Sequence, residues 1–261
     1  MQIIAISNQK DGVGKTTSAL NLGVCLAELG RRVLLVDLDP QSNLTLATLG
    51  DRVWFNIAEV FGNMQPGTRQ MVSIIREYKL NLFIAPSDIA LSSSELGLVA
   101  RQGRENILKR ALDDLSGVRD YDYCLRDCES SLGILVVNAL TAANYVIAPT
   151  LPTAMDLRGL KLFLNSVDIV RKNLNPGLQL MGVVVCQYQE HLKLHQAAMR
   201  DLDNSGLNIL GVINRSVQAA VSMGAGEPMT GGVIAEQYKY IAEKVDQWHL
   251  GPGLFVGRFV G

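Results

Sequence analysis

The segment Ser7–Thr17 reads SNQKDGVGKTT, and its residue types and spacing point to phosphate chemistry. It follows a β-branched run at Gln2–Ser7, which we predict to be a strand. It opens the apolar stretch Thr16–Leu29, a predicted helix that Gly30 closes. Glycines in such a turn let backbone N–H groups approach phosphate oxygens, and the helix N-terminus adds its positive dipole end. The segment therefore predicts a phosphate-binding loop.

The side chains of this loop suit a nucleoside triphosphate with Mg²⁺. Lys15 can bridge the β- and γ-phosphates, the Thr16 hydroxyl can ligate Mg²⁺, and Thr17 is placed for the α-phosphate. The strict pattern would have glycine at Gln9, but the strand-loop-helix context supports the shorter match. The alternative is a tight glycine turn without a ligand, which Gly-Lys-Thr-Thr disfavours. We expect the cradle to comprise Asp11, Gly12, Val13, Gly14, Lys15, Thr16 and Thr17.

Apolar strand and helix patterns alternate along the rest of the 261 residues. This alternation predicts an α/β fold with a single doubly wound, mainly parallel sheet flanked by helices. Further strands are expected at Arg32–Asp37, Leu80–Ala85, Tyr121–Asp127, Tyr145–Pro149, Leu180–Cys186 and Leu207–Ile213. Helices are expected at Glu105–Leu115, Leu132–Ala142, Leu157–Asn173, Lys193–Asp203 and Ala235–Trp248, with short helices within Asp51–Arg76. We expect one domain over residues 1–250 and a glycine-rich tail at Gly251–Gly261.

Composition narrows the function classes. The chain is 48% hydrophobic with a formal net charge of -1, so any nucleic-acid surface must be a local basic patch. Its four cysteines lack paired metal spacing, and we interpret them as reduced, mostly buried thiols. No uncharged apolar stretch reaches membrane-spanning length, so no membrane partner is expected.

Three motifs give the chain a family resemblance. Lys10 with the loop makes K-x-G-x-G-K-T-T, Val33–Thr45 reads VLLVDLDPQSNLT, and Tyr121–Thr150 contains a strand ending in Asp-Cys. In this order and spacing they resemble the ParA/MinD family of deviant Walker A ATPases, most closely the small, Soj-like partition ATPases. The resemblance implies a P-loop NTPase fold, ATP or ADP and Mg²⁺ as cofactors, and slow ATP hydrolysis that a partner stimulates.

The resemblance also assigns roles. Asp39 matches the aspartate that orients the attacking water, and Asp37 supports the same network. Asp127 would hold Mg²⁺ through water, which makes Thr16, Asp37 and Asp127 the expected metal set. Lys10 would reach the phosphates of a second subunit in a homodimer that sandwiches two ATP molecules. Without the resemblance, the two strand-end aspartates would be a solvated turn and Lys10 an ordinary exposed lysine.

The resemblance implies partners as well. Relatives of this size bind nonspecific DNA as ATP dimers and respond to a ParB-like stimulator, so a cytoplasmic, nucleoid-associated protein is expected. The candidate DNA contacts are Lys193, Arg200 and Arg215, for which a solvated surface is an equal alternative. His191 and His195 are expected to be surface or packing residues rather than metal ligands.

The chain departs from the family at the phosphate site. Asp11 stands where the family has glycine, and Glu129-Ser130 replaces a Pro-Pro pair. One hypothesis is that Asp11 weakens the ATP dimer. The other is that the loop is rearranged so that Asp11 faces solvent or pairs with a lysine. Arg126 interrupts an apolar strand, and we expect it to pair with a neighbouring carboxylate or to mark the strand's exit into solvent.

Three other functions stay open at this point. A MinD-like positioning ATPase needs an amphipathic membrane helix, for which the Gly251–Gly261 tail has too many glycines. A reductase like the nitrogenase iron protein needs two cluster-holding cysteines per subunit. A nucleotide-binding protein that does not hydrolyse, with Asp11 as the cause, would be separated from an ATPase by its turnover.

Overall fold

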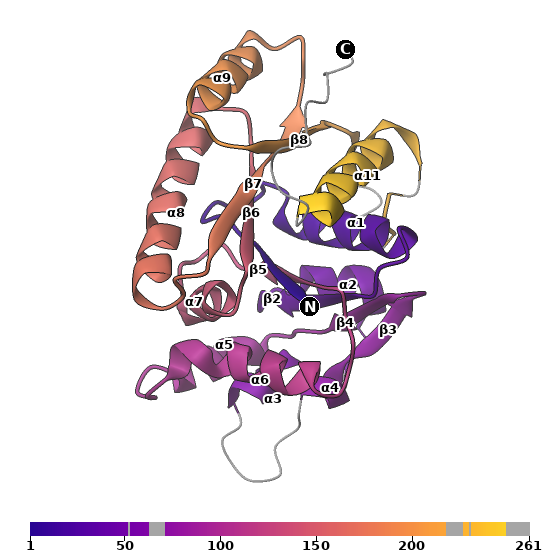
Figure 1. Cartoon of the computed structure of the whole chain (residues 1–261), viewed down its shortest axis with the longest axis vertical. Coiled ribbons are helices and arrows are strands. Elements are labelled where there is room, and N and C mark those ends of the chain that lie inside the picture. Colours follow the sequence, from indigo (N-terminus) through magenta and orange to yellow (C-terminus); the bar gives the residue numbers. More distant parts are fainter. Residues whose placement is uncertain (52, 63–70, 218–226, 230, 249–261) are drawn as a thin grey trace.

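A computed structural model describes residues 1–51, 53–62, 71–217, 227–229 and 231–248. Its centre is one eight-stranded sheet with the strand order β3-β4-β2-β5-β1-β6-β7-β8 (Figure 1). Neighbouring strands are parallel except β3 and β4, which are antiparallel. The strands are β1 (Gln2–Ile6), β2 (Val33–Leu38), β3 (Arg76–Lys79), β4 (Leu82–Ala85), β5 (Tyr123–Cys128), β6 (Tyr145–Thr150), β7 (Gln179–Tyr188) and β8 (Ile209–Asn214). The predicted doubly wound α/β fold is confirmed.

Helices cover both faces of this sheet (Figure 1). One face packs against α1 (Lys15–Glu28), α2 (Asn43–Leu49) and α11 (Gly232–Gln247). The other face packs against α3 (Ile57–Gly62), α4 (Met71–Ile74), α5 (Ala90–Gly97), α6 (Ile107–Ser116), α7 (Ile134–Thr141), α8 (Ala154–Asn173) and α9 (Lys193–Asn204). A short 3₁₀ turn at Arg104–Asn106 precedes α6.

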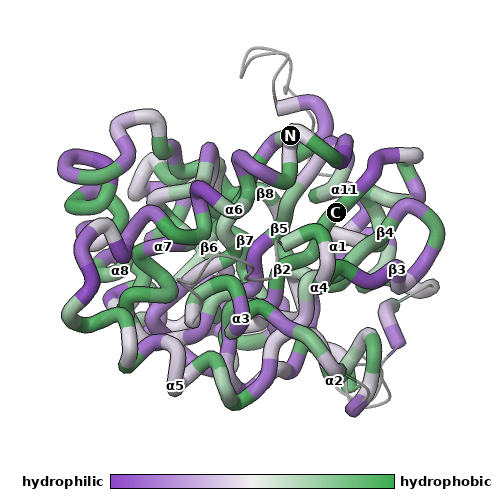
Figure 2. Tube along the Cα trace, turned by 90° about the horizontal axis from the view of Figure 1, so that it is seen from below, coloured by the Kyte–Doolittle hydropathy of each residue, from purple (hydrophilic) through white to green (hydrophobic). Residues whose placement is uncertain are grey.

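The burial of the strands follows from their sequences. All six residues of β2 are buried, as a parallel strand with helices on both faces requires. In β1, Ile4 and Ile6 face the α1 side, whereas Ala5 faces the opposite core. Figure 2 shows that hydrophilic and hydrophobic residues alternate along the peripheral α8.

The strand order places the phosphate loop at a switch point of the sheet. β1 lies between β5 and β6, and the chain leaves its carboxyl end through the Ser7–Thr17 segment into α1. In doubly wound sheets ligands bind at this position, outside the carboxyl ends of the strands where the connections diverge.

Some elements were not predicted. β3 has the sequence REYK at the sheet edge, and its charged residues carry no apolar alternation. The helices α2 and α5 are also additions, each of eight residues or fewer. The expected short helices of the Asp51–Arg76 segment are present as α3 and α4. The Gly251–Gly261 tail lies outside the described residues.

Candidate functional site

The loop between β1 and α1 has the backbone of an anion cradle. Gly12 and Gly14 have φ angles of 70° and 92°, in the left-handed region that glycine tolerates best. A Cβ on Gly14 would also lie 3.1 Å from the sulfur of buried Cys186. Gly14 is the N-cap of α1 and offers no side chain to the first helical N–H groups. These donors are therefore available to an anionic ligand.

A cavity of about 540 Å³ opens beside this loop. All three strand-to-helix connections that the motifs singled out contribute to its wall, which fits a bound triphosphate. The lining residues are Asp11, Gly12, Gly14, Lys15, Thr16, Thr17, Asp39, Asn43, Leu46, Ala47, Ser130 and Gln187.

Lys15 is largely buried and is held by two oxygens of its own chain. Its Nζ donates to the Lys10 carbonyl at 2.9 Å and to the Ser130 hydroxyl at 2.6 Å. Ser130 in turn donates to the carboxylate of Asp11. The exposed carboxylate of Asp11 is thus linked to the Lys15 ammonium through one hydroxyl. A phosphate could take the place of the Ser130 hydroxyl on Nζ.

Asp11 fits the loop without backbone strain. Among the described residues, the non-glycine positions with positive φ are Ser42, Asn81 and Gln187, so Asp11 has an ordinary backbone conformation. Its side chain is exposed and reaches Lys15 through Ser130. The exposed side chain is the placement that the second of our two hypotheses expects, whereas its position at the cavity wall keeps the negative charge that the first hypothesis requires. The two departures from the family pattern, Asp11 and Ser130, are hydrogen-bonded to each other.

Asp127 lies behind the loop as a buried carboxylate. Within the described part of the chain, neither of its oxygens has a hydrogen-bond partner. Burial, with the charge of the neighbouring Asp37, raises the pKa of Asp127 well above its ordinary range. The Thr16 hydroxyl opposes this rise, although it does not form a hydrogen bond of good geometry with Asp127, and Lys15 opposes it too. Such a carboxylate is suited to coordinate a cation or to accept a hydrogen bond from a water.

Asp37 is the cross-strand neighbour of Asp127 on β2. It accepts hydrogen bonds from the Thr45 backbone N–H at 2.9 Å, from the Thr45 hydroxyl at 2.7 Å and from the Asp39 N–H at 3.1 Å. Burial raises the pKa of Asp37 to about 6, and these hydrogen bonds oppose the rise. Asp37 thereby anchors the β2–α2 connection and fixes Asp39 at the cavity wall.

The donor set fits Mg²⁺ held mainly by a nucleotide. No group of three or more His, Cys, Asp or Glu side chains suited to a metal ion occurs among the described residues. Mg²⁺ characteristically keeps several waters and takes one or two protein ligands beside phosphate oxygens. The Thr16 hydroxyl and, through water, the unpartnered oxygens of Asp127 meet that requirement.

A second cavity of about 340 Å³ adjoins the first at Gly14, Thr17 and Gln187. Gln187 has a φ of 57°, and its amide donates to the Gly12 carbonyl at 3.2 Å. The other lining residues are Cys186, Ile213, Asn214, Arg215, Ser216, Val217, Ile234 and Tyr238. The two cavities share three lining residues and therefore lie side by side.

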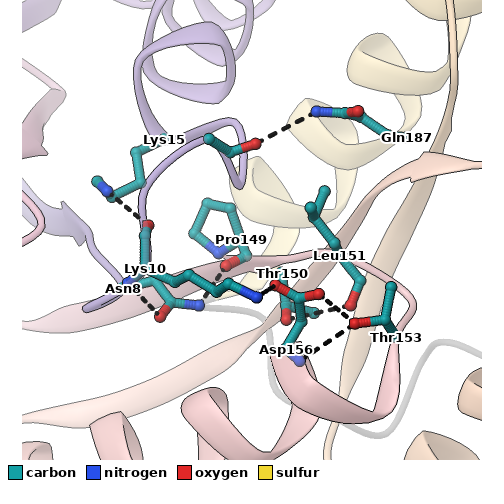
Figure 3. Close-up of polar contacts among 10 residues, drawn as sticks. Asn8, Lys10, Lys15, Pro149, Thr150, Leu151, Thr153, Asp156 and Gln187 are labelled. Carbon is teal, nitrogen blue, oxygen red and sulfur yellow. Dashed lines mark hydrogen bonds and ion pairs between the residues drawn. The ribbon is translucent and has the colours of Figure 1, made fainter.

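Lys10 points away from both cavities. Figure 3 shows its side chain running to α8, where Nζ lies 2.6 Å from a carboxylate oxygen of Asp156. The backbone of Lys10 stays with the loop, because its N–H donates to Asn8 and its carbonyl accepts from Lys15. Asn8 donates to the carbonyl of Pro149 at 2.7 Å and so joins the ends of β1 and β6.

The candidate DNA residues lie in two places. Lys193 and Arg200 are exposed one heptad apart on α9, while Arg215 follows β8 and lines the second cavity. The Arg215 N–H donates to Tyr188, whose ring lies 6.0 Å from that of His195. His195 is buried and accepts from the Gln189 N–H, as expected of a packing residue.

The expectation for Arg126 is wrong. This side chain is completely buried on the face of the sheet that α3–α9 cover, and among the described residues none of its guanidinium nitrogens has a hydrogen-bond partner. Burial lowers the pKa of Arg126. It neither pairs with a neighbouring carboxylate nor reaches solvent. The four cysteines are free and buried, as predicted.

Comparison with known proteins decides the family. The AAA domain family (AAA_31) matches residues 1–180. The sporulation initiation inhibitor protein Soj of Bacillus subtilis is 42% identical over 185 residues, which cover 70% of this chain and 72% of Soj. The chromosome partitioning protein ParA of Caulobacter vibrioides is 34% identical over 231 residues, covering 88% of this chain and 86% of ParA. The chain belongs to the ParA/MinD family of P-loop ATPases.

A solved structure that contains a nucleotide and magnesium has the same fold. The crystal structure of cobyrinic acid a,c-diamide synthase from Mycobacterium smegmatis with bound ADP and magnesium has a TM-score of 0.83 at 32% identity. The match covers 100% of both chains. Among the described residues of the present structure, no helix has the length and apolar character to cross a membrane.

Several residues of this ParA/MinD-type site were not singled out by sequence reasoning. Thr45 orients Asp37, and Asp156 holds Lys10. Ser130 was noted only as a replacement for proline, but it bridges Lys15 and Asp11. No local pattern marks Thr45 or Asp156, since each acts through a contact that only the fold creates.

Proposed function

We propose that this protein is a Mg²⁺-dependent ATPase of ParA type that dimerises on ATP and acts in DNA partition. The observation that carries the proposal is the phosphate cradle at the switch point, with Lys15 and Thr16 in front of Asp127, which is buried and has no hydrogen-bond partner among the described residues. Kinship with Soj and ParA supports the biological setting, including nonspecific DNA, a ParB-like stimulator and a cytoplasmic, nucleoid-associated location.

Different residues of the chain have different roles in nucleotide binding and hydrolysis. Backbone N–H groups of the Gly12–Thr17 loop and the Lys15 ammonium hold the phosphates. Thr16 and Asp127 orient the metal shell, and Asp39 accepts a hydrogen bond from the attacking water. When bound, Mg²⁺ would neutralise charge on the β- and γ-phosphates. In the dimer, Lys10 of each copy would offset charge on the nucleotide of the other.

Solution mass is the direct test of this proposal. Light scattering after gel filtration should show a monomer with Mg-ADP and a dimer with Mg-ATP. Lys15→Ala should stay monomeric with both nucleotides, and Asp39→Ala should accumulate as the ATP dimer because hydrolysis is lost. If the parent protein and Asp11→Gly both remain monomeric with Mg-ATP, the dimer switch is refuted.

DNA binding gives a separate prediction. The Lys193→Ala/Arg200→Ala double variant should bind random duplex DNA more weakly in Mg-ATP, with the slope of log affinity against log salt smaller by about 2. Lys79→Ala/Lys109→Ala is the matched control, since it removes equal charge from exposed residues at β3 and α6. Fluorescence anisotropy at several salt concentrations measures both. If the two double variants lose DNA affinity equally, α9 does not contact the DNA.

The alternative function is a nucleotide-binding protein in which Asp11 impairs dimerisation or hydrolysis. The Lys15–Ser130–Asp11 chain favours it, because the aspartate adds negative charge where phosphates should bind. A MinD-like role would need a membrane helix, and its candidate tail lies outside the described residues. The iron-protein reading is disfavoured because all four cysteines are buried.

Two variants separate the charge of Asp11 from its bulk. Asp11→Asn keeps the size and removes the charge, so it should bind Mg-ADP roughly three- to tenfold more tightly in calorimetry. Asp11→Gly should match it in affinity and exceed it in dimerisation if the side chain also obstructs a second subunit. Affinities equal to the parent's would show that the charge does not act on the phosphates.

A further inference from the structure

The ion pair between Lys10 and Asp156 is unequal in its exposure. The Lys10 side chain is 42% exposed, whereas that of Asp156 is 3% exposed, and their charged atoms lie 2.6 Å apart. Apart from this ion pair, the Oδ1 oxygen of Asp156 has no polar partner among the described residues. A buried carboxylate without a counter-charge is costly, whereas an exposed lysine without its partner remains solvated by water, so breaking the pair costs Asp156 more than Lys10.

Helix capping does not account for this carboxylate. Asp156 lies at the third position of α8, and its N–H donates to the hydroxyl of the N-cap Thr153 at 3.3 Å. In a capping box the side chain of the third helical residue would accept a hydrogen bond from the backbone N–H of the N-cap residue. Here the Thr153 N–H donates to Leu151 instead, and Asp156 accepts the Thr153 hydroxyl through Oδ2. The Oδ1 oxygen is left for Lys10.

The backbone of Lys10 fixes the direction of its side chain. Its carbonyl accepts from Lys15, and its N–H donates to Asn8, which is bound to Pro149 at the end of β6. The ammonium therefore lies against α8 while its own peptide is part of the phosphate loop (Figure 3). Lys10 does not line either cavity of its own chain.

We propose that Asp156 is a positioning residue that holds Lys10 on its own chain until a second nucleotide-bound copy draws it away. This inference rests on the proposed function, because it assumes that Lys10 serves the partner's phosphates. When Lys10 leaves Asp156, the buried carboxylate loses its counter-charge. This cost opposes dimer formation until a nucleotide is bound to each copy. The Lys10–Asp156 ion pair therefore weakens dimerisation and raises the protein concentration at which the ATP dimer forms.

The test is a double-variant cycle on the ATP dimer. Asp156→Asn keeps the shape and an acceptor for Thr153 but loses the charge. With Mg-ATP it should lower the dimer dissociation constant by roughly five- to tenfold in sedimentation. Combined with Lys10→Ala it should leave that constant as it is in Lys10→Ala alone, because there is no lysine to release. The same change in both backgrounds, or none in either, would overturn the proposal.

A second readout does not depend on dimerisation. In the nucleotide-free protein, Asp156→Asn should make the Lys10 amine several-fold more reactive toward acetic anhydride, relative to the exposed Lys161, by mass spectrometry. Thr153→Ala is the control: it removes the helix cap and should lower stability while leaving Lys10 reactivity unchanged. Unchanged reactivity in Asp156→Asn would overturn the positioning role. Raised reactivity in a protein that never dimerises would support the ion pair and refute the proposed function instead.

Discussion

Replacing Arg126 with leucine should raise the free energy of unfolding by about 2–4 kcal/mol. The guanidinium is completely buried, and within the described residues it has no hydrogen-bond partner. Its neighbours in the sheet register are Ala5 and Val36, which offer no charge. Leucine removes the desolvation cost of a cation and keeps apolar contacts with the surrounding core.

Urea denaturation at neutral pH measures this effect. Arg158→Leu on α8 is the control, because Arg158 is exposed and its loss should change stability by no more than about 0.5 kcal/mol. A less stable Arg126→Leu would mean that the guanidinium has a partner in solution, such as a bound anion or a buried water. Nucleotide affinity should be unchanged, since Arg126 faces away from the phosphate loop.

Asp127→Asn should have opposite effects on stability and on ligand binding. Burial raises the pKa of Asp127 above its ordinary value of 3.8, so the folded chain favours a proton that the unfolded chain has released. The unfolding free energy therefore falls as the pH rises above that value. The neutral amide of the variant has neither this pH-dependent loss of stability nor the charge repulsion with Asp37. We therefore expect its unfolding free energy to exceed that of the parent by about 1–3 kcal/mol at pH 8, and the difference to vanish toward pH 4.

The same substitution should remove the binding advantage of magnesium. Thermal denaturation with ADP, with and without Mg²⁺, should show a magnesium-dependent rise in Tm for the parent but not for Asp127→Asn. Asp37→Asn is the comparison, with an expected loss of stability, because both oxygens of Asp37 accept hydrogen bonds and the amide NH2 would face a donor in place of one of them. A retained magnesium effect in Asp127→Asn would place the metal elsewhere.

The sequence contained enough to predict the sheet and the loop. Each predicted strand combines an apolar run with a following polar turn, and the glycines at positions 12 and 14 mark a left-handed backbone that few other residues accept. These are local signals. The charged edge strand at Arg76–Lys79 has no such signal, since it is defined by pairing with β4 alone.

Long-range contacts could not be predicted. Arg126 looked like a strand end because arginine is rarely fully buried, and nothing in its neighbours shows that the strand continues under helices. Asp156 resembles an ordinary first-turn acid of a helix. Its contact with Lys10 bridges 146 positions and depends on β6 lying beside β1.

The central place of β1 also governs when this protein can fold during synthesis. β1 pairs with β5 and β6, which lie much later in the chain and end at Thr150. Until those segments are synthesised, the apolar strand β1 has no sheet partner. Such late pairing slows folding and leaves nascent chains open to aggregation. The pairing of β1 therefore depends on the synthesis of β5 and β6.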